Sequence, residues 1–230
     1  MKKSEVRARI EDIGIIPGVR VGDPDKARFA AEAVYRGGIP IAEITMTVPN
    51  AVDVISYLAT KLPDMVVGGG TVLNTETARR CIDAGAKFLT SPGLVMKVVE
   101  FAAKNDVVVF PGALTPTEVI AAWDAGADFV KIFPCAQVGG PVYLKSLKVP
   151  LPQVPLIASG GVNQVSAVSF ILAGATALGI GSELMPHIAV HRRNEDHIQE
   201  LARRFISMVK DARAQQEELR EGQRGGIDSK

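Results

Sequence analysis

The stretch of sequence that decides the fold is Ala127-Asp128-Phe129-Val130-Lys131-Ile132-Phe133-Pro134. Side chains along a strand point alternately to opposite faces, so Lys131 shares one face with two phenylalanines, and Val130 and Ile132 occupy the other. Both faces are therefore largely apolar. Such a strand is typical of a parallel sheet that is covered on both sides.

Lys131 is the unusual residue of this strand, because an ammonium group there loses much of its hydration. Loss of hydration favours the uncharged amine, which is a nucleophile. A purely structural lysine stays open as an alternative, since its head group could extend to the surface or pair with a buried carboxylate.

Apolar runs like this one recur along the chain and are separated by helical patterns. Several helices end in a small-residue turn such as Ala125-Gly126-Ala127, where glycine supplies the left-handed stop before the next strand. We expect eight strands, over Ile13–Arg20, Ile41–Thr45, Val66–Gly69, Phe88–Ser91, Val107–Pro111, Phe129–Phe133, Leu156–Ser159 and Ala177–Gly181.

Eight strands alternating with helices predict an α/β fold, a parallel (β/α)₈ barrel of the TIM type. A doubly wound open sheet would need a glycine-rich dinucleotide turn after its first strand, and Ile15–Arg20 offers none. We expect residues 4–12 to form a helix across the bottom of the barrel and residues 192–220 to form a charged helical extension. Residues 1–220 would make a single barrel domain, followed by a disordered tail over residues 221–230.

Composition narrows the classes of function. The chain has 230 residues, 47% of them hydrophobic, which is enough for one domain with a substantial core. A net charge near +1 argues against nucleic-acid partners. Cys81 and Cys135 have neither metal-binding nor redox spacing, so a reducing compartment is expected. With no apolar run near roughly 20 residues and no signal-peptide pattern, we expect a soluble cytoplasmic protein without membrane partners.

Chemistry in such a barrel collects where the strands end and the βα loops begin. Glu43 shares its strand face with Ile41 and Thr45, so its carboxylate should face the barrel interior, as Lys131 does. Two ionisable groups in one dry space favour a shared site, and a structural salt bridge between them is the alternative. The polar or turn-forming residues at the other strand ends are Arg20, Thr47, Thr71, Ser91, Pro92, Phe133, Ser159 and Ser182.

Two glycine turns, Ser159–Asn163 and Gly179–Ser182, follow the seventh and eighth expected strands. Loops at these strands commonly hold a phosphate group in barrels, through backbone N–H groups. The Ser182 hydroxyl could add a donor. Arg20 follows the first strand, beside the eighth around the ring, and is either a cationic partner for an anion or simply an exposed loop residue.

This set of residues suits imine chemistry on a keto substrate. The lysine amine attacks a carbonyl and loses water, and the protonated imine then withdraws electrons from a neighbouring C–C bond. Glu43 is the obvious group to move protons. The reaction needs no metal or organic cofactor. All three histidines follow the last strand, so histidine triads and histidine-rich metal sites are not expected.

The chain resembles the family of 2-keto-3-deoxy-6-phosphogluconate (KDPG) aldolases, also described as 4-hydroxy-2-oxoglutarate (KHG) aldolases. The resemblance runs from about Ile15 to Pro186, and the ordered set of motifs is highly specific. The motifs are Ile16-Pro17-Gly18-Val19-Arg20, Glu43-Ile44-Thr45-Met46-Thr47, Gly68-Gly69-Gly70-Thr71-Val72-Leu73, Ser91-Pro92-Gly93, Phe110-Pro111-Gly112, Lys131-Ile132-Phe133-Pro134, Ser159-Gly160-Gly161-Val162 and Gly181-Ser182.

The resemblance implies a Schiff-base aldolase of the Entner–Doudoroff type, with Lys131 as the imine-forming lysine and Glu43 as the general acid and base. Family members are typically homotrimers. The residues that would bind substrate fall into two groups. Those at the pyruvyl end would be Thr71, Ser91 and Pro92, and Phe133 would form a wall of the pocket. Those at the phosphate end would be Gly160, Gly161 and Ser182, assisted by Arg20.

Two positions depart from the family pattern. Some members have an arginine four residues after the glutamate, which engages the anionic end of the substrate, and here that position is Thr47. Carboxylate binding would then rest on hydroxyls such as that of Thr47, on backbone donors and on Arg20. Ser159 stands where the family often has threonine, which keeps a hydroxyl.

The leading hypothesis is reversible cleavage of KDPG to pyruvate and glyceraldehyde 3-phosphate. The galactonate epimer of KDPG and unphosphorylated 4-hydroxy-2-oxoglutarate stay open as substrates, because a few contacts set the stereochemistry at C4. Two other classes also stay open. One is a phosphosugar isomerase or synthase in which Lys131 acts only electrostatically, and the other is a phosphosugar-binding barrel without activity.

Overall fold

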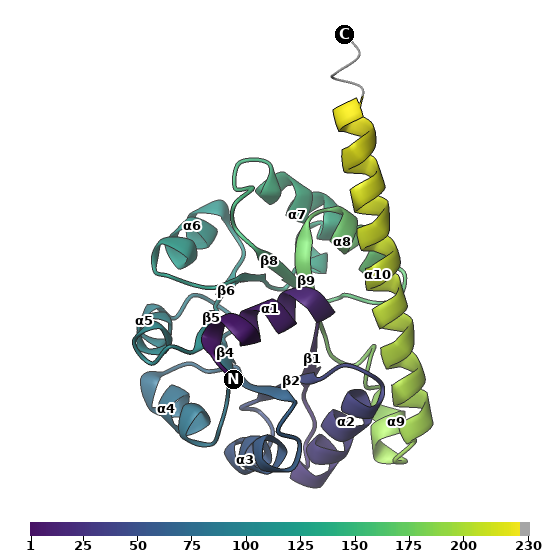
Figure 1. Cartoon of the computed structure of the whole chain (residues 1–230). Helices are drawn as coiled ribbons and strands as arrows, with labels where there is room; N and C mark the ends of the chain where they lie inside the picture. The colour runs from purple at the N-terminus through teal and green to yellow at the C-terminus, as the bar shows by residue number, and fades with distance from the viewer. Residues whose placement is uncertain (226–230) are drawn as a thin grey trace.

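A computed structural model of the chain describes residues 1–225 and shows a ring of parallel strands surrounded by helices (Figure 1). The order of the strands around the ring follows the chain, with β1 between β2 and β9. The strand segments are β1 (Ile15–Val19), β2 (Ile41–Thr45), β3 (Val66–Gly70), β4 (Phe88–Thr90), β5 (Val108–Phe110), β6 (Gly112–Ala113), β7 (Val130–Ile132), β8 (Leu156–Ser159) and β9 (Ala175–Ile180).

The fifth predicted strand is divided at Pro111 into β5 and β6, and this corrects the expected run Val107–Pro111. Proline lacks the N–H that a central strand needs, so the ladder is interrupted there. β5 pairs with β4 and β6 pairs with β7, while the Pro111 carbonyl accepts a hydrogen bond from the Lys131 N–H at 2.9 Å. The two segments therefore occupy one strand position, and the predicted (β/α)₈ barrel is confirmed.

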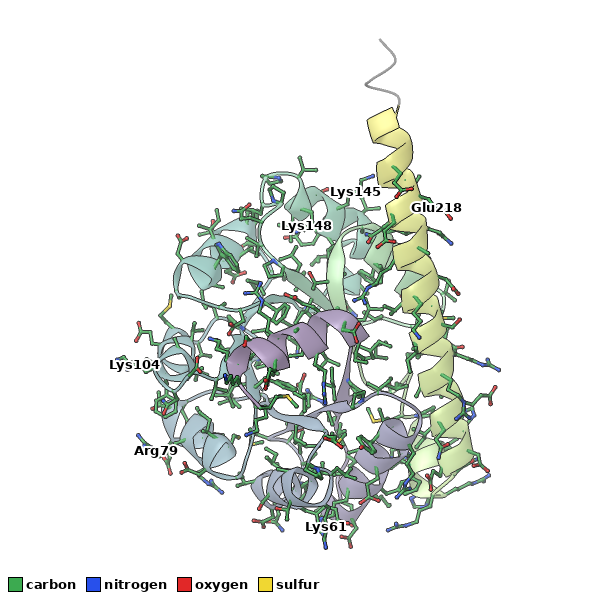
Figure 2. The ribbon with its side chains drawn as sticks, viewed as in Figure 1. Lys61, Arg79, Lys104, Lys145, Lys148 and Glu218 are labelled. Carbon is green, nitrogen blue, oxygen red and sulfur yellow. The ribbon has the colours of Figure 1, made fainter. Side chains whose placement is uncertain are left out.

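Helices alternate with the strands and form the outer layer, with charged side chains such as Lys61, Arg79 and Lys104 on the outer surface (Figure 2). Within residues 1–225, no helix combines the length and the apolar character needed to cross a membrane. The helices are α1 (Lys3–Ile13), α2 (Pro24–Arg36), α3 (Ala51–Lys61), α4 (Thr75–Asp83), α5 (Met96–Lys104), α6 (Pro116–Asp124), the 3₁₀ turn η1 (Ala136–Val138), α7 (Gly140–Lys148), α8 (Ala167–Leu172), α9 (His187–His191) and α10 (Glu195–Gly225).

The predicted N-terminal helix is α1, which lies across one end of the barrel (Figure 1). Its Val6 and Ile10 side chains are buried. Asp128, just before β7, holds the helix in place, because its carboxylate forms an ion pair with Lys3 at 3.0 Å and accepts a hydrogen bond from the Val109 N–H at 2.9 Å. α1 therefore covers the end of the barrel opposite to the carboxyl ends of the strands.

The predicted C-terminal extension is α9 and α10, and α10 packs along α2 and α8 before it extends past the barrel (Figure 1). The long helix begins at Glu195 because the Asn194 side chain accepts a hydrogen bond from the His197 N–H at its start. It continues through Gly225, so the predicted tail of residues 221–230 begins within α10. The last part of that predicted tail, residues 226–230, lies outside the described residues.

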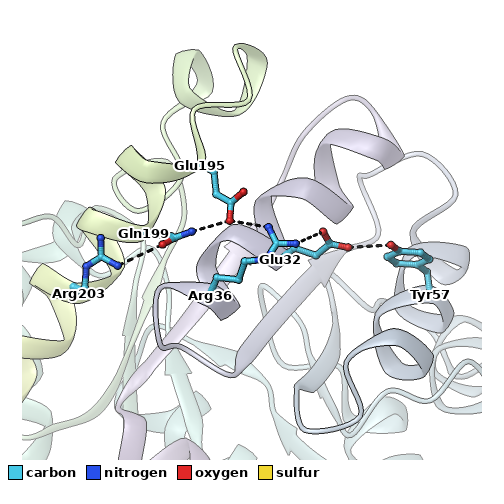
Figure 3. Close-up of polar contacts among 6 residues, drawn as sticks. All are labelled: Glu32, Arg36, Tyr57, Glu195, Gln199 and Arg203. Carbon is cyan, nitrogen blue, oxygen red and sulfur yellow. Dashed lines mark hydrogen bonds and ion pairs between the residues drawn. The ribbon is translucent and has the colours of Figure 1, made fainter.

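A polar network joins the first turns of α10 to α2 and α3 (Figure 3). Arg36 on α2 bridges Glu195 at 2.7 Å and Glu32 at 3.1 Å, and Glu32 also accepts a hydrogen bond from the Tyr57 hydroxyl. The hydrogen bond from Arg36 lowers the pKa of the Glu195 carboxyl below its ordinary value. Because these residues lie on the outer surface, the network contributes little to the free energy of folding. Its role is to orient α10 against α2 and α3.

Three aromatic rings fill the barrel interior on the N-terminal side of Lys131. Phe88 stacks on Phe110 with 5.0 Å between ring centroids, and Phe110 meets Phe129 edge-on at 6.2 Å. Gly68 on β3 faces the Phe88 ring, and a Cβ atom at that position would lie 2.3 Å from two of its carbons. Because Gly68 has no side chain, the Phe88 ring can occupy the space beside β3.

Gly68→Ala should lower the free energy of unfolding by about 1–3 kcal/mol, because the added methyl group overlaps a ring that close packing prevents from moving. Chemical denaturation measures this loss. Gly22→Ala is the control, since a Cβ there would meet nothing within 4 Å. Equal stability of Gly68→Ala and Gly22→Ala would show that the interior can relax around the extra methyl group.

Candidate active site

Lys131 and Glu43 meet inside the barrel. Lys131 lies in the middle of β7 and Glu43 in the middle of β2, and both side chains point inward because of strand alternation. Their side chains are only 11% and 6% exposed, and Lys131 Nζ lies 3.5 Å from Glu43 Oε2. This distance is at the long limit of a hydrogen bond, so the amine is near the carboxylate without being held tightly by it.

The pair borders a cavity of about 490 Å³ that extends along the carboxyl ends of β1, β2, β7, β8 and β9. The Lys131 ammonium also lies 5.6 Å from the centre of the Phe133 ring, which forms part of the wall. Arg20 and Ser182 are exposed and mark the solvent side of the cavity. The predicted site residues that line it are Arg20, Glu43, Lys131, Phe133, Gly160, Gly161 and Ser182.

Four predicted site residues are not among those that line this cavity: Thr47, Thr71, Ser91 and Pro92. Thr47 is exposed, and its hydroxyl shares a hydrogen bond with Thr45 at 2.8 Å. The Ser91 hydroxyl is buried and donates to the Gly93 carbonyl at 2.7 Å. Thr71 has φ 58°, an unusual value for a β-branched residue. These residues follow β2, β3 and β4 at the carboxyl ends of the strands.

Sequence reasoning missed several residues that the structure adds to the site. Thr45 lines the cavity, and its hydroxyl donates to the Val19 carbonyl at 3.1 Å, joining β2 to β1. Glu183, which follows β9, and His187, the first residue of α9, also line it. Glu183 follows Ser182 directly in the sequence, and no motif there marks it as part of the site.

The glycine turn after β8 is required by close packing as well as by backbone conformation. Gly160 and Gly161 both have φ 84°, in the left-handed region that other residues avoid. A Cβ on Gly161 would lie 2.3 Å from that of Ala136, and the Gly160 carbonyl accepts a hydrogen bond from the Ala136 N–H at 3.0 Å. The turn therefore lies directly against the segment that follows Lys131.

The charges around the cavity are mixed. Arg20 and Lys131 supply the cationic side chains among its described lining residues, and Glu43 and Glu183 supply the carboxylates. Burial raises the pKa of the Cys135 thiol to about 11, so this nearby cysteine is a protonated thiol at neutral pH. Within residues 1–225, no group of three or more His, Cys, Asp or Glu side chains is placed to hold a metal ion.

A buried primary amine beside a carboxylate can perform a defined reaction. The amine can add to a carbonyl carbon, and the carboxylate can accept and return the protons that addition and dehydration require. The cavity beyond the pair is large enough for a small organic substrate and carries polar groups on its solvent side.

Comparison with known proteins agrees with this geometry. A family model described as KDPG and KHG aldolase matches residues 6–201. The chain is 30% identical over 196 residues to a KHG/KDPG aldolase of Escherichia coli strain K12, which covers 85% of this chain and 92% of that protein. It is also 30% identical over 193 residues to a 2-dehydro-3-deoxy-phosphogluconate aldolase of Pseudoalteromonas atlantica, covering 84% and 90%.

Among solved structures, the KDPG aldolase of Legionella pneumophila with pyruvate captured at low pH as a covalent carbinolamine intermediate is similar. It superposes with a TM-score of 0.80 at 29% identity, over 86% of this chain and 96% of that chain. The family match spans most of the barrel, including both residues of the buried pair. The chain belongs to the KDPG and KHG aldolase family.

Proposed function

We propose that this chain is a Schiff-base aldolase that reversibly cleaves KDPG to pyruvate and glyceraldehyde 3-phosphate. The observation that carries the proposal is the buried contact of 3.5 Å between Lys131 and Glu43 at the edge of a cavity. The names of the relatives support the substrate, and the covalent pyruvate adduct in the Legionella protein supports the type of intermediate.

The first half of the reaction forms the imine. Glu43 is near enough to take a proton from the lysine, and the uncharged Lys131 amine then attacks the C2 carbonyl carbon of the substrate. The product of this addition is a carbinolamine. Protonation of its hydroxyl by Glu43, directly or through water, lets it leave as water and gives the protonated imine.

The second half breaks the carbon chain. Glu43 accepts the proton of the C4 hydroxyl, the electrons of the C3–C4 bond move to the imine nitrogen, and glyceraldehyde 3-phosphate departs. The enamine that remains takes a proton at C3 to become the imine of pyruvate. Addition of water then releases pyruvate and returns the free amine.

The solvent side of the cavity supports binding of the substrate phosphate. Gly160 and Gly161 line it with backbone alone, and the Ser182 hydroxyl lies at the end of β9. β1 pairs with β9, so Arg20 follows the neighbouring strand and brings a positive charge to the same side. Backbone N–H groups, a hydroxyl and a guanidinium are suitable partners for a phosphate dianion.

The opposite end of the substrate carries a carboxylate, and its binding site stays a prediction. Phe133 lines the cavity next to Lys131, whereas Thr71, Ser91 and Pro92 are not among the residues that line it. Thr47 can act there through its hydrogen bond to Thr45, which does line the cavity.

We infer that the enzyme works in the cytoplasm as a homotrimer. Cys81 and Cys135 are free and buried, which suits a reducing compartment. Leu73 and Ile120 are large apolar side chains that are about half exposed, at 54% and 46%, and supply apolar area of the kind found in subunit interfaces.

Trapping with pyruvate and borohydride tests the imine. Reduction should leave a stable pyruvyl adduct that raises the intact mass, and peptide mapping should locate it at Lys131. Lys131→Ala should lose both the adduct and cleavage of KDPG, while Lys61→Ala, which removes an exposed lysine on α3, should keep both. Absence of an adduct from a protein that binds pyruvate would exclude the Schiff-base mechanism.

Glu43→Gln should lower kcat by about 10²–10⁴-fold, because the amide cannot exchange the protons that each step moves. Steady-state cleavage rates measure this effect. Glu183→Gln, which changes the other carboxylate of the cavity, should have a much smaller effect on kcat. A Glu43→Gln enzyme that works at full rate would remove Glu43 from the mechanism.

Ser182→Ala should raise KM for KDPG several-fold and leave kinetics with unphosphorylated 4-hydroxy-2-oxoglutarate unchanged, because only the first substrate presents a phosphate to this hydroxyl. The two substrates are compared on the same enzyme preparation, with the galactonate epimer as a third. If KM rises equally for both, Ser182 contributes to the fold of the loop and not to phosphate binding.

A further inference from the structure

Gly70, the last residue of β3, leaves open the space in which the Glu43 side chain lies. A Cβ atom at Gly70 would be 2.1 Å from Glu43 Oε1 and 2.6 Å from both Cδ and Cγ. Gly70 is not among the glycines with positive φ, so its backbone conformation suits any residue. The requirement for glycine at this position is therefore one of space.

The backbone at Gly70 is held from both sides. Thr45 of β2 is the register partner of Gly70, and the Gly70 carbonyl accepts a hydrogen bond from the Met46 N–H at 2.8 Å. Two residues later, the Val72 N–H donates to the Thr90 carbonyl at 3.0 Å, which ties the chain to the end of β4. Because the strand is fixed, a side chain added at Gly70 would displace Glu43.

The two neighbouring glycines of β3 differ from Gly70 in what they face. Gly68 shares the inward face but meets the rigid Phe88 ring, so a side chain there acts on packing. Gly69 points outward, where a Cβ would lie 2.8 Å from Cys81 Sγ behind the sheet. Only Gly70 of the three meets the carboxylate that borders Lys131.

We propose that Gly70 is a positioning residue for the aldolase reaction, which sets where the Glu43 carboxylate lies relative to Lys131. This inference rests on the proposed role of Glu43. Glu43 Oε1 faces Gly70 and Oε2 faces Lys131, so the carboxylate lies between the two strands with one oxygen on each side. A Cβ atom at Gly70 would lie 2.1 Å from Glu43 Oε1, whereas an ordinary contact between the two atoms is about 3.5 Å, so the carboxylate would have to shift by more than about 1 Å.

Gly70→Ala should lower kcat by about 10²-fold, since a displacement on the order of 1 Å at a catalytic group has an effect of that size. Trapping of pyruvate should still reach completion on long incubation, more slowly than in the wild type, because Lys131 itself is unchanged. The matched control is Gly69→Ala, which adds the same methyl group to the same strand on the opposite face and should keep kcat.

A double-mutant cycle separates positioning from a general structural effect. If Gly70→Ala acts through Glu43, adding it to Glu43→Gln should cost less than about threefold in kcat, because the carboxylate it displaces is already absent. If the loss of kcat in the double variant equals the product of the two single losses, the proposal is overturned. It is also overturned if Gly70→Ala keeps the wild-type kcat while Glu43→Gln is slow. A fast Glu43→Gln enzyme would instead refute the proposed role of Glu43.

A stability measurement keeps the proposal testable if Gly70→Ala does not fold. Truncation in Glu43→Ala removes the atoms that the new methyl group would meet, so the double variant Gly70→Ala with Glu43→Ala should fold, with a midpoint of thermal unfolding equal to that of Glu43→Ala alone. A double variant that is as unstable as Gly70→Ala would show that the methyl group clashes with something other than Glu43.

Discussion

The burial of two opposite charges inside the barrel is the constraint on which the rest of the site depends. Removing an ammonium group and a carboxylate from water costs several kcal/mol per ion, and their attraction offsets this only when the geometry is excellent. At 3.5 Å the Lys131–Glu43 contact is long, so the pair is a poor source of stability. The surrounding ring of strands and the packed phenylalanines beneath it must hold the pair in place. This imbalance agrees with a chemical role for both residues.

Much of this arrangement follows from local rules that the sequence displays. Strand alternation alone places Lys131 and Glu43 on inward faces, and the order of the strands brings β2 and β7 around one interior. The glycine turns that border β8 and β9 are likewise visible, because left-handed backbone and close approach both demand glycine. The division of the fifth strand also has a local cause, since Pro111 cannot donate to a ladder, but the expected run Val107–Pro111 did not include it.

Other features depend on volumes that no local pattern reports. The sequence places every strand end at one rim, but it does not say which sector of the rim is hollow. That is decided by side chains far apart in the chain, and it leaves Thr71, Ser91 and Pro92 outside the cavity while Glu183 and His187 border it. The role of Gly70 was hidden for the same reason, because its neighbour in space, Glu43, is 27 residues away in sequence.

The contacts of the C-terminal helix are a further feature that no local pattern reports. Arg213, beyond the family match, donates to backbone carbonyls of Glu11, Asp12 and Thr176 and so fastens α10 to α1 and β9.

The helix α1 has a consequence for the order of events in the proposed reaction. Because it covers one end of the barrel, substrate and products share the entrance at the carboxyl ends of the strands. In the proposed binding mode, the phosphate end of the substrate lies toward that entrance and the pyruvyl end is attached to Lys131 deeper inside. The aldehyde must therefore leave while the three-carbon fragment is still covalently bound. In the direction of synthesis the order of binding is reversed. Pyruvate enters the cavity first, and the phosphorylated aldehyde then binds between it and the entrance.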